Sequence, residues 1–202
     1  CNARNLAMRS VISKYVFFAD DDIRLYDNFL LEKSLKEMKR LGSSGLNLNC
    51  LQPGEKTIFS KIKQWGAFGS GTSIVLTNFA KRCRFSEFLE KGFGEDIDYG
   101  LQLRNLGCDV IYHPDLQFVH LKADRGGFRE LSGIGDDIPK PSPTMMYLVQ
   151  NSYSKYMLKG YKITLFLKFY TKQPIRNPWS YYVSMKKRWE MSESLCNELS
   201  SN

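Results

Sequence analysis

The sequence contains no apolar run close to the roughly 20 residues that a membrane-spanning helix requires, so we do not expect the chain to cross a bilayer. It also lacks a C-x-x-C pair, and its five cysteines are widely and irregularly spaced, which favours free thiols in a reducing cytosol. No secretory signal pattern, internal repeat or low-complexity tract is present. The chain begins with Cys1 rather than Met, and we expect the natural N-terminus to lie upstream.

The charge balance is basic, with a net charge of +8 over 202 residues. A positive chain attracts phosphates, whether of nucleotides, lipids or nucleic acids, and the sign alone does not choose among them. The length and the mixed composition are those of an ordinary globular protein. We therefore predict an α/β main domain over residues 1–143 and a basic, aromatic-rich helical extension over residues 144–202.

Local patterns predict several elements of the main domain. The run Tyr15–Ala19 is short, continuous and apolar, which is typical of a strand that is buried on both faces. Asp27 and Gly42 are placed to begin and end a helix over 27–41, and Gly107 to end a helix over 95–106. Residues 45–75 combine turn residues with short apolar stretches, and the other predictions are the end of a helix in 1–13 and strands at 72–76, 108–112 and 116–121.

Three consecutive carboxylates, Asp20, Asp21 and Asp22, directly follow the strand at 15–19. In open α/β sheets ligands bind outside the carboxyl ends of the strands, and three adjacent carboxylates repel one another unless a cation or solvent separates them. This pattern favours a Mg²⁺ or Mn²⁺ site that bridges to a nucleotide diphosphate. The alternative is a solvated acidic turn that favours the following helix through its dipole.

A second acidic pair, Glu95 and Asp96, follows the glycine-rich segment 91–94. Carboxylates in the first turn of a helix commonly cap unpaired backbone N–H groups, and this alternative is sufficient for the pair alone. The same position suits a general base that accepts a proton from a sugar hydroxyl. His120, at a predicted strand end, is either a histidine bonded to backbone or a third metal ligand, and an imidazole among oxygen ligands favours Mn²⁺ over Mg²⁺.

The remainder of the chain has two parts of different character. Residues 122–143 are rich in Gly, Asp and Pro, and we predict a mobile loop or active-site lid there. Residues 144–190 interleave aromatic and aliphatic residues with lysines and arginines against the single acid Glu190. This extension is either a set of helices with solvated lysines or a surface that contacts an anionic membrane, and no nucleic-acid motif accompanies its charge.

Several motifs occur in an order that resembles the second half of a family 2 glycosyltransferase with the A-type glycosyltransferase fold. The resemblance covers about residues 1–125, and it is the ordered set that is specific. The segments that carry it are Ala3–Asn5, Phe18–Asp22, Gly69–Thr72, Gly94–Asp98 with Leu103–Gly107, His113–Pro114 and Val119–His120. It implies a mixed central sheet flanked by helices, without the first nucleotide-binding β-α-β portion, so the chain as given is expected to bind donor weakly and to expose strand edges.

The resemblance also implies roles for individual residues. Asp22 and His120 would hold the metal, Asp20 would face the ribose or base, and Asp21 is the variable member between them. Arg4 would lie near the nucleotide, and Arg104 would be a structural partner of the acidic motif. Asp96 would be the catalytic base, with Glu95 beside it contacting the acceptor or the donor sugar.

The acidic motifs together with the resemblance predict a metal-dependent transferase that moves a sugar to a hydroxyl of a glycan or lipid-linked glycan in surface polysaccharide synthesis. Inversion and a nucleotide donor that is UDP-linked are what the resemblance implies. The expected location is the cytoplasm, with peripheral contact to the inner face of the plasma membrane. One rival hypothesis is a non-catalytic remnant that binds sugar nucleotides or glycans. The other is a basic module that binds membrane surfaces or nucleic acid, in which the acidic clusters only cap helices.

Overall fold

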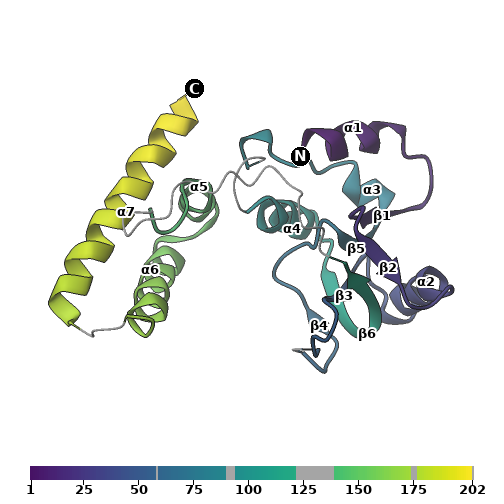
Figure 1. Ribbon diagram of the computed structural model, residues 1–202. Coiled ribbons are helices and arrows are strands. Elements are labelled where there is room, and N and C mark those ends of the chain that lie inside the picture. Colours follow the sequence, from purple (N-terminus) through teal and green to yellow (C-terminus); the bar gives the residue numbers. More distant parts are fainter. Residues whose placement is uncertain (58, 90–93, 122–138, 174–176, 202) are drawn as a thin grey trace. The chain divides into compact units, whose positions relative to one another are not determined.

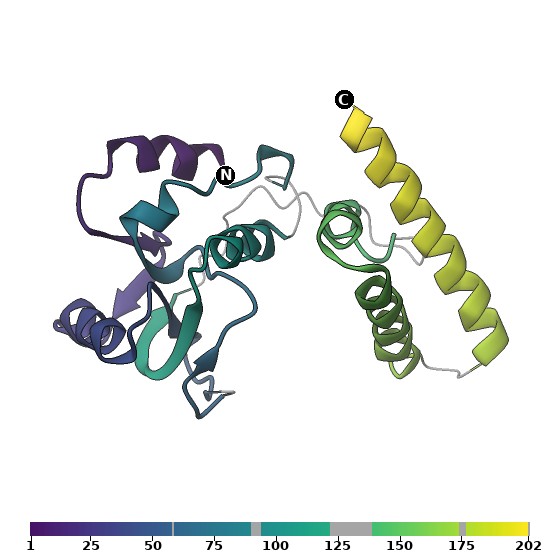
Figure 2. The same cartoon turned by 180° about the vertical axis from the view of Figure 1, so that it is seen from behind.

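The structure is a computed structural model that describes residues 1–57, 59–89, 94–121, 139–173 and 177–201 (Figure 1). It contains two compact units, which Figure 2 shows from behind. Unit 1 comprises Cys1–Glu87 and Glu95–Gly127, and unit 2 comprises Phe88–Gly94 and Phe128–Asn202. The domain boundary after residue 143 stays a prediction, and all but the last five residues of the predicted lid lie outside the described ranges.

Unit 1 is built around a mixed sheet in the order β1-β5-β3-β6-β2, with β4 paired to β6. Neighbouring strands are antiparallel except for β3 and β6, which are parallel. The strands are β1 (Tyr15–Ala19), β2 (Ile23–Leu25), β3 (Gly45–Leu51), β4 (Lys63–Gln64), β5 (Thr72–Leu76) and β6 (Val110–His120). The predicted mixed sheet is therefore confirmed.

Four helices of unit 1 accompany the sheet, namely α1 (Asn2–Ser10), α2 (Leu30–Leu41), α3 (Thr77–Ala80) and α4 (Glu95–Asn105), and a 3-10 helix η1 covers Glu87–Leu89. Strand residues alternate between two core clusters, as the two-residue period of a strand requires. Val75 belongs to a cluster with residues of α1 and α4, whereas its neighbour Ile74 belongs to a cluster with residues of α2. The sheet thus lies between helices on both faces.

The predicted strand at 15–19 is present, and both of its faces contact core clusters through Phe18 on one side and Phe17 on the other. Phe18 is the one member that is fully buried, and β1 is the last strand on its side of the sheet within the described residues. The expectation of complete burial on both faces was therefore too strong. Continuous apolar runs mark contact with two layers but do not fix the position of a strand in the sheet.

Helix α2 begins at Leu30, three residues after the predicted start. Asp27 instead forms a turn before the helix, in which its Oδ1 accepts a hydrogen bond from the Phe29 N–H at 2.8 Å. The predicted end is confirmed, because Gly42 adopts the left-handed conformation with φ 62° and its N–H bonds back to Lys39. Helix α4 begins at Glu95 and is followed by Gly107 at φ 79°, as the sequence indicated.

The two strands predicted at 108–112 and 116–121 are one strand, β6. The pairing with β3 jumps from His113 to Gln117, so the segment between them is a bulge rather than a turn. Pro114 has no N–H to donate to the ladder, and its carbonyl accepts a hydrogen bond from the Asn49 amide at 2.9 Å. The Pro114 carbonyl is therefore satisfied by a side chain that lies 65 positions away in the sequence.

The described residues of unit 2 form three α-helices, α5 (Pro143–Ser152), α6 (Lys155–Tyr170) and α7 (Pro178–Ser201). Met146, Val149, Trp189 and Cys196 form its buried cluster. Ser142 and Ser154 cap α5 and α6, each accepting a backbone N–H through its hydroxyl at 3.3 Å. The predicted C-terminal helical extension is therefore present, and no described helix has both the length and the apolar character to span a membrane.

Candidate active site

The acidic triplet lies in the short connection between β1 and β2, and strand pairing brings His120 to it. Ile23, the first residue of β2, is paired with His120 at the end of β6. The Leu121 N–H also donates a 2.8 Å hydrogen bond to the Asp22 carbonyl, which fixes the turn against β6. Residues almost 100 positions apart are thereby placed side by side by the register of two antiparallel strands.

Asp20, Asp22 and His120 form the one group of three or more potential ligands for a metal ion within the described residues. One ligand atom from each lies within 4.8 Å of the other two. The His120 Nε2 is 3.0 Å from the Asp22 Oδ1, and their side chains are 32 % and 22 % exposed. Half-exposed carboxylates and an imidazole that converge in this way can bind a hydrated divalent cation.

Of the two other residues predicted near the nucleotide, Arg4 lies at this group and Asp21 does not belong to it. The Arg4 guanidinium donates a hydrogen bond to the Asp20 Oδ1 at 3.0 Å and lies 5.6 Å from the centre of the Phe85 ring. Arg4 is thereby held at the acidic group by an ion pair and an aromatic contact. Asp21 is exposed and does not belong to the group of converging ligands.

Asp96 lies in the first turn of α4 and accepts a hydrogen bond at Oδ1 from the Ser70 N–H, at 3.3 Å. Burial raises the pKa of Asp96 to about 6, with a further upward contribution from the charge of Glu95. Bonds from Ser70 and the charge of Arg4 oppose this increase in pKa. The group is therefore mostly ionised at neutral pH but holds its proton far more readily than an ordinary aspartate, as a general base requires.

The loop Gly69–Thr72 contacts both Asp20 of the converging ligands and Asp96. A methyl group added at Gly71 would lie 2.0 Å from the Asp20 Oδ2, so a larger residue here would displace the Asp20 carboxylate. The preceding residue, Ser70, donates its N–H to Asp96. Adjacent residues of one loop thus contact Asp20 on one side and Asp96 on the other, and the charge of Arg4 acts on both carboxylates.

Asn47 supports this loop, and the sequence reasoning missed it. Its Oδ1 accepts hydrogen bonds from the Gly69 N–H at 3.1 Å, the Thr72 hydroxyl at 3.0 Å and the Ser73 hydroxyl at 2.9 Å. The side chain is buried in the central strand β3. The available signal was the polar asparagine within the otherwise apolar run Gly45–Leu48, since a buried amide must find partners.

The resemblance implied that Arg104 is a structural partner of the acidic motif. Arg104 donates a hydrogen bond to the Trp65 carbonyl at 3.1 Å and is not paired with an acidic residue among the described side chains. Cys50, at the end of β3, was not predicted to matter. Burial and the nearby charges of Asp20 and Asp22 raise the pKa of its thiol to about 11.

Comparison with solved structures identifies the fold. No protein-family model matches the sequence, and no curated protein matches it significantly. A crystal structure of S. aureus TarS 1-349 in complex with UDP-GlcNAc matches with a TM-score of 0.54 and 16% identity, over 83% of this chain and 51% of that chain. A crystal structure of S. aureus TarS 1-349 also matches, with a TM-score of 0.47 and 16% identity over 59% of this chain and 39% of that chain.

The chain spans about half the length of the TarS structure that was solved with UDP-GlcNAc. Together with the mixed sheet between helices, this similarity defines an α/β protein with a partial A-type glycosyltransferase fold and a helical extension. At 16% identity the similarity establishes the fold alone. The chemistry must therefore be argued from the side chains of unit 1.

Proposed function

We propose that unit 1 is the catalytic part of an inverting, family 2-like glycosyltransferase. It transfers a sugar from a nucleotide-linked donor, a UDP-sugar, to a hydroxyl of a glycan or lipid-linked glycan in surface polysaccharide synthesis. The observation that carries the proposal is the convergence of Asp20, Asp22 and His120, with Asp96 hydrogen-bonded to the loop that also contacts Asp20. The TarS structure that was solved in complex with UDP-GlcNAc supports the donor class.

The ligand set fits a divalent cation of the Mn²⁺ or Mg²⁺ type. Asp22 and His120 would hold the ion, with Asp20 as a third ligand, and a set of oxygens with one imidazole favours Mn²⁺. When bound, the ion would offset the negative charge of the departing diphosphate. Arg4 adds a fixed positive charge at the same group of carboxylates, where it can contact a donor phosphate.

Asp96 is the proposed general base. With a pKa of about 6 it is ionised at neutral pH, and it can accept the proton of an acceptor hydroxyl as that oxygen attacks the donor sugar. The Ser70 N–H donates to the Asp96 Oδ1 and helps to hold the carboxylate in place for this task. General-base assistance contributes roughly 10²–10⁴-fold to such reactions. Glu95, beside Asp96 in the first turn of α4, keeps the pKa of Asp96 high and can contact a sugar hydroxyl.

Calorimetry with Mn²⁺ and UDP tests the binding half of this proposal. We expect UDP to bind in the presence of Mn²⁺, and Asp22→Asn and His120→Ala each to weaken binding by at least about tenfold. Asp115→Asn is the matched control, since Asp115 is an exposed carboxylate of β6 outside the ligand group. Binding that is unchanged in Asp22→Asn would refute the metal site.

A transfer assay with UDP-sugars separates the enzyme from a non-catalytic binding protein. We expect turnover in the wild type and a loss of roughly 10²–10⁴-fold in Asp96→Asn, with UDP binding retained. Metal-dependent UDP binding without turnover of any UDP-sugar would favour the binding protein. Equal turnover in Asp96→Asn would remove this residue from the role of base.

A further inference from the structure

Helix α6 in unit 2 has apolar side chains on two opposite faces. Its inner face contributes Leu158, Tyr161 and Leu165, which pack against the buried cluster of unit 2. A helix that packs on one side normally has polar residues on the other. In α6 the opposite side carries further large apolar residues, so core packing does not account for its composition.

The outer face is a continuous line of residues at helical spacing. Tyr156, Ile163 and Leu167 lie at positions i, i+7 and i+11, and their side chains are 89 %, 51 % and 56 % exposed. Gly160 occupies position i+4 of the same line, and a methyl group added there would find no atom within 4 Å. We call these four residues the outer stripe. Nothing in the described part of the chain covers it at Gly160.

The charge around the outer stripe has a single sign. Helix α6 contains four lysines and no acidic residue, with Lys159 on one flank of the stripe and Lys168 on the other, at about 100° per residue. The three acidic residues in the described part of unit 2, Glu190, Glu193 and Glu198, all belong to α7.

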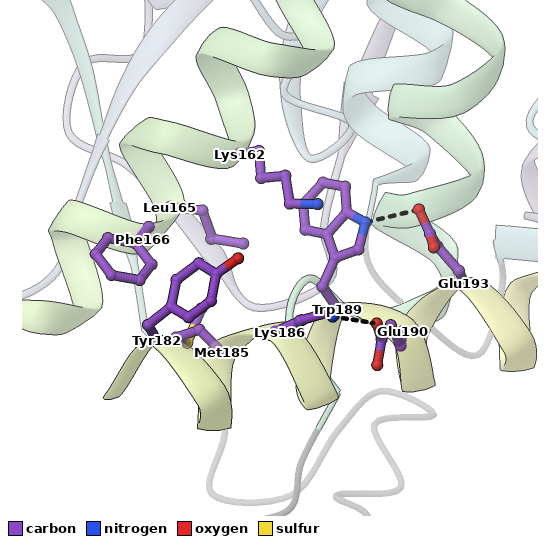
Figure 3. A pocket seen from close by; sticks show the side chains of 9 residues that line it. All are labelled: Lys162, Leu165, Phe166, Tyr182, Met185, Lys186, Trp189, Glu190 and Glu193. Carbon is purple, nitrogen blue, oxygen red and sulfur yellow. Dashed lines mark hydrogen bonds and ion pairs between the residues drawn. The ribbon is translucent and has the colours of Figure 1, made fainter. Parts of the chain in front are cut away.

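Two of these glutamates line the pocket between α6 and α7, a cavity of about 190 Å³, and both have partners there (Figure 3). Glu193 accepts a 2.6 Å hydrogen bond from the Trp189 indole, and Glu190 lies 3.7 Å from the Lys186 amine. The Lys162 amine lies 4.6 Å from the centre of the Trp189 ring. The polar groups of the pocket therefore interact with one another, and Lys155, Lys159 and Lys168 have no acidic partner among the described residues.

We infer that the outer stripe and the lysines beside it dock unit 2 on the surface of an anionic phospholipid membrane. An apolar line bordered by uncompensated lysines fits such a surface, because the apolar side chains enter the headgroup region while the amines meet the lipid phosphates. A second copy of the chain is a poorer occupant, because it would bring another set of lysines against the first without acidic partners. This inference is independent of the activity proposed for unit 1.

The test measures co-sedimentation of the full chain with phosphatidylcholine vesicles that contain or lack phosphatidylglycerol. We expect binding to the anionic vesicles only, weakened by added salt. Ile163→Glu with Leu167→Glu should weaken binding by at least about tenfold, and Lys155→Gln with Lys159→Gln by about fivefold for each lysine. Ile12→Glu is the matched control, because this side chain is fully exposed in unit 1.

Gly160→Leu provides a test in the opposite direction. It completes the apolar line without meeting a neighbour and should increase binding several-fold. Three outcomes would overturn the inference: no binding to anionic vesicles, binding unchanged by the stripe variants, or binding lost in Ile12→Glu as in the double glutamate variant. Self-association of the wild type that the stripe variants abolish, without vesicle binding, would assign the face to a second copy instead.

Discussion

Replacing Asp96 by Asn should make the protein more stable at neutral pH while it removes the proposed base. The carboxyl of Asp96 is largely buried, and its burial raises its pKa to about 6 from an ordinary value of 3.8. Asn keeps an oxygen that can accept the hydrogen bond from the Ser70 N–H, which is 3.3 Å from the Asp96 Oδ1. The substitution therefore removes the buried charge and leaves the acceptor in place.

The magnitude follows from the difference between the two pKa values. Each pKa unit corresponds to about 1.36 kcal/mol, so a difference of about two gives an upper bound near 3 kcal/mol. Because Asp96 keeps some contact with solvent, we expect a gain of about 1–3 kcal/mol in the free energy of unfolding. For a protein of this size that corresponds to an increase in Tm of roughly 3–10 °C.

The sign depends on pH. Below pH 3.8 the Asp96 carboxyl is protonated in the folded and unfolded chains, so wild type and variant should have similar stability. Between pH 3.8 and about 6 the unfolded chain loses this proton while the folded chain keeps it, and the wild type loses stability as the pH rises. Above about pH 6 the full difference in favour of Asn applies.

Thermal unfolding of both proteins across this pH range is the assay, with Asp115→Asn as a control for an exposed carboxylate. The reasoning is refuted if Asp96→Asn has the same Tm as the wild type at neutral pH, or if its advantage persists undiminished below pH 3.8.

In a transfer assay the same pKa predicts that kcat/KM of the wild type increases with pH through about 6. A stabilised and inactive variant would indicate that the buried charge is retained for catalysis.

Two further predictions concern the loop beside the acidic groups. Gly71→Ala should reduce Mn²⁺ affinity at least about tenfold, because the new methyl group would occupy the space of the Asp20 carboxylate. Gly66→Ala, which meets no atom within 4 Å, should bind Mn²⁺ like the wild type, and calorimetry compares the two. Asn47→Ala should lower the free energy of unfolding by about 2–4 kcal/mol in denaturant titrations, because it leaves the Gly69 N–H and the Ser73 hydroxyl without their shared acceptor. An unchanged midpoint would show that water replaces the lost acceptor.

The elements that the sequence predicted well are those with strong local signals. The apolar runs at 15–19 and 72–76 are β1 and β5, and the glycines at 42 and 107 end their helices with positive φ. The elements that it predicted poorly depend on distant partners. The strand β3 was not distinguished from its surroundings, although its pairing with both β5 and β6 places it near the middle of the sheet.

The bulge in β6 is a second feature that depends on a distant partner. A proline in the middle of a run indicated the end of a strand, because proline cannot donate a hydrogen bond to the ladder. Here the Asn49 amide donates to the Pro114 carbonyl, and β6 continues on the other side of the bulge. The bulge takes Pro114 out of the pairing with β3, and its carbonyl is satisfied from that other strand, so no local pattern could have predicted this arrangement.

For the site, the sequence predicted which residues carry the chemistry but not what holds them in place. Asp20, Asp22 and His120 converge because β2 pairs with β6, a contact that follows from the topology. Asp20 and Asp96 do not share a hydrogen bond, yet each contacts one of two adjacent loop residues, Gly71 and Ser70.

Because Asn47 anchors both ends of this loop, the proposed metal ligand and the proposed base share one support. A change in Asn47 should therefore weaken metal binding and alter the pKa of the base together. Substitution of Asp22 should weaken metal binding alone. Measuring the Mn²⁺ affinity and the pH dependence of kcat/KM in the Asn47 and Asp22 variants distinguishes a coupled site from two independent acidic clusters.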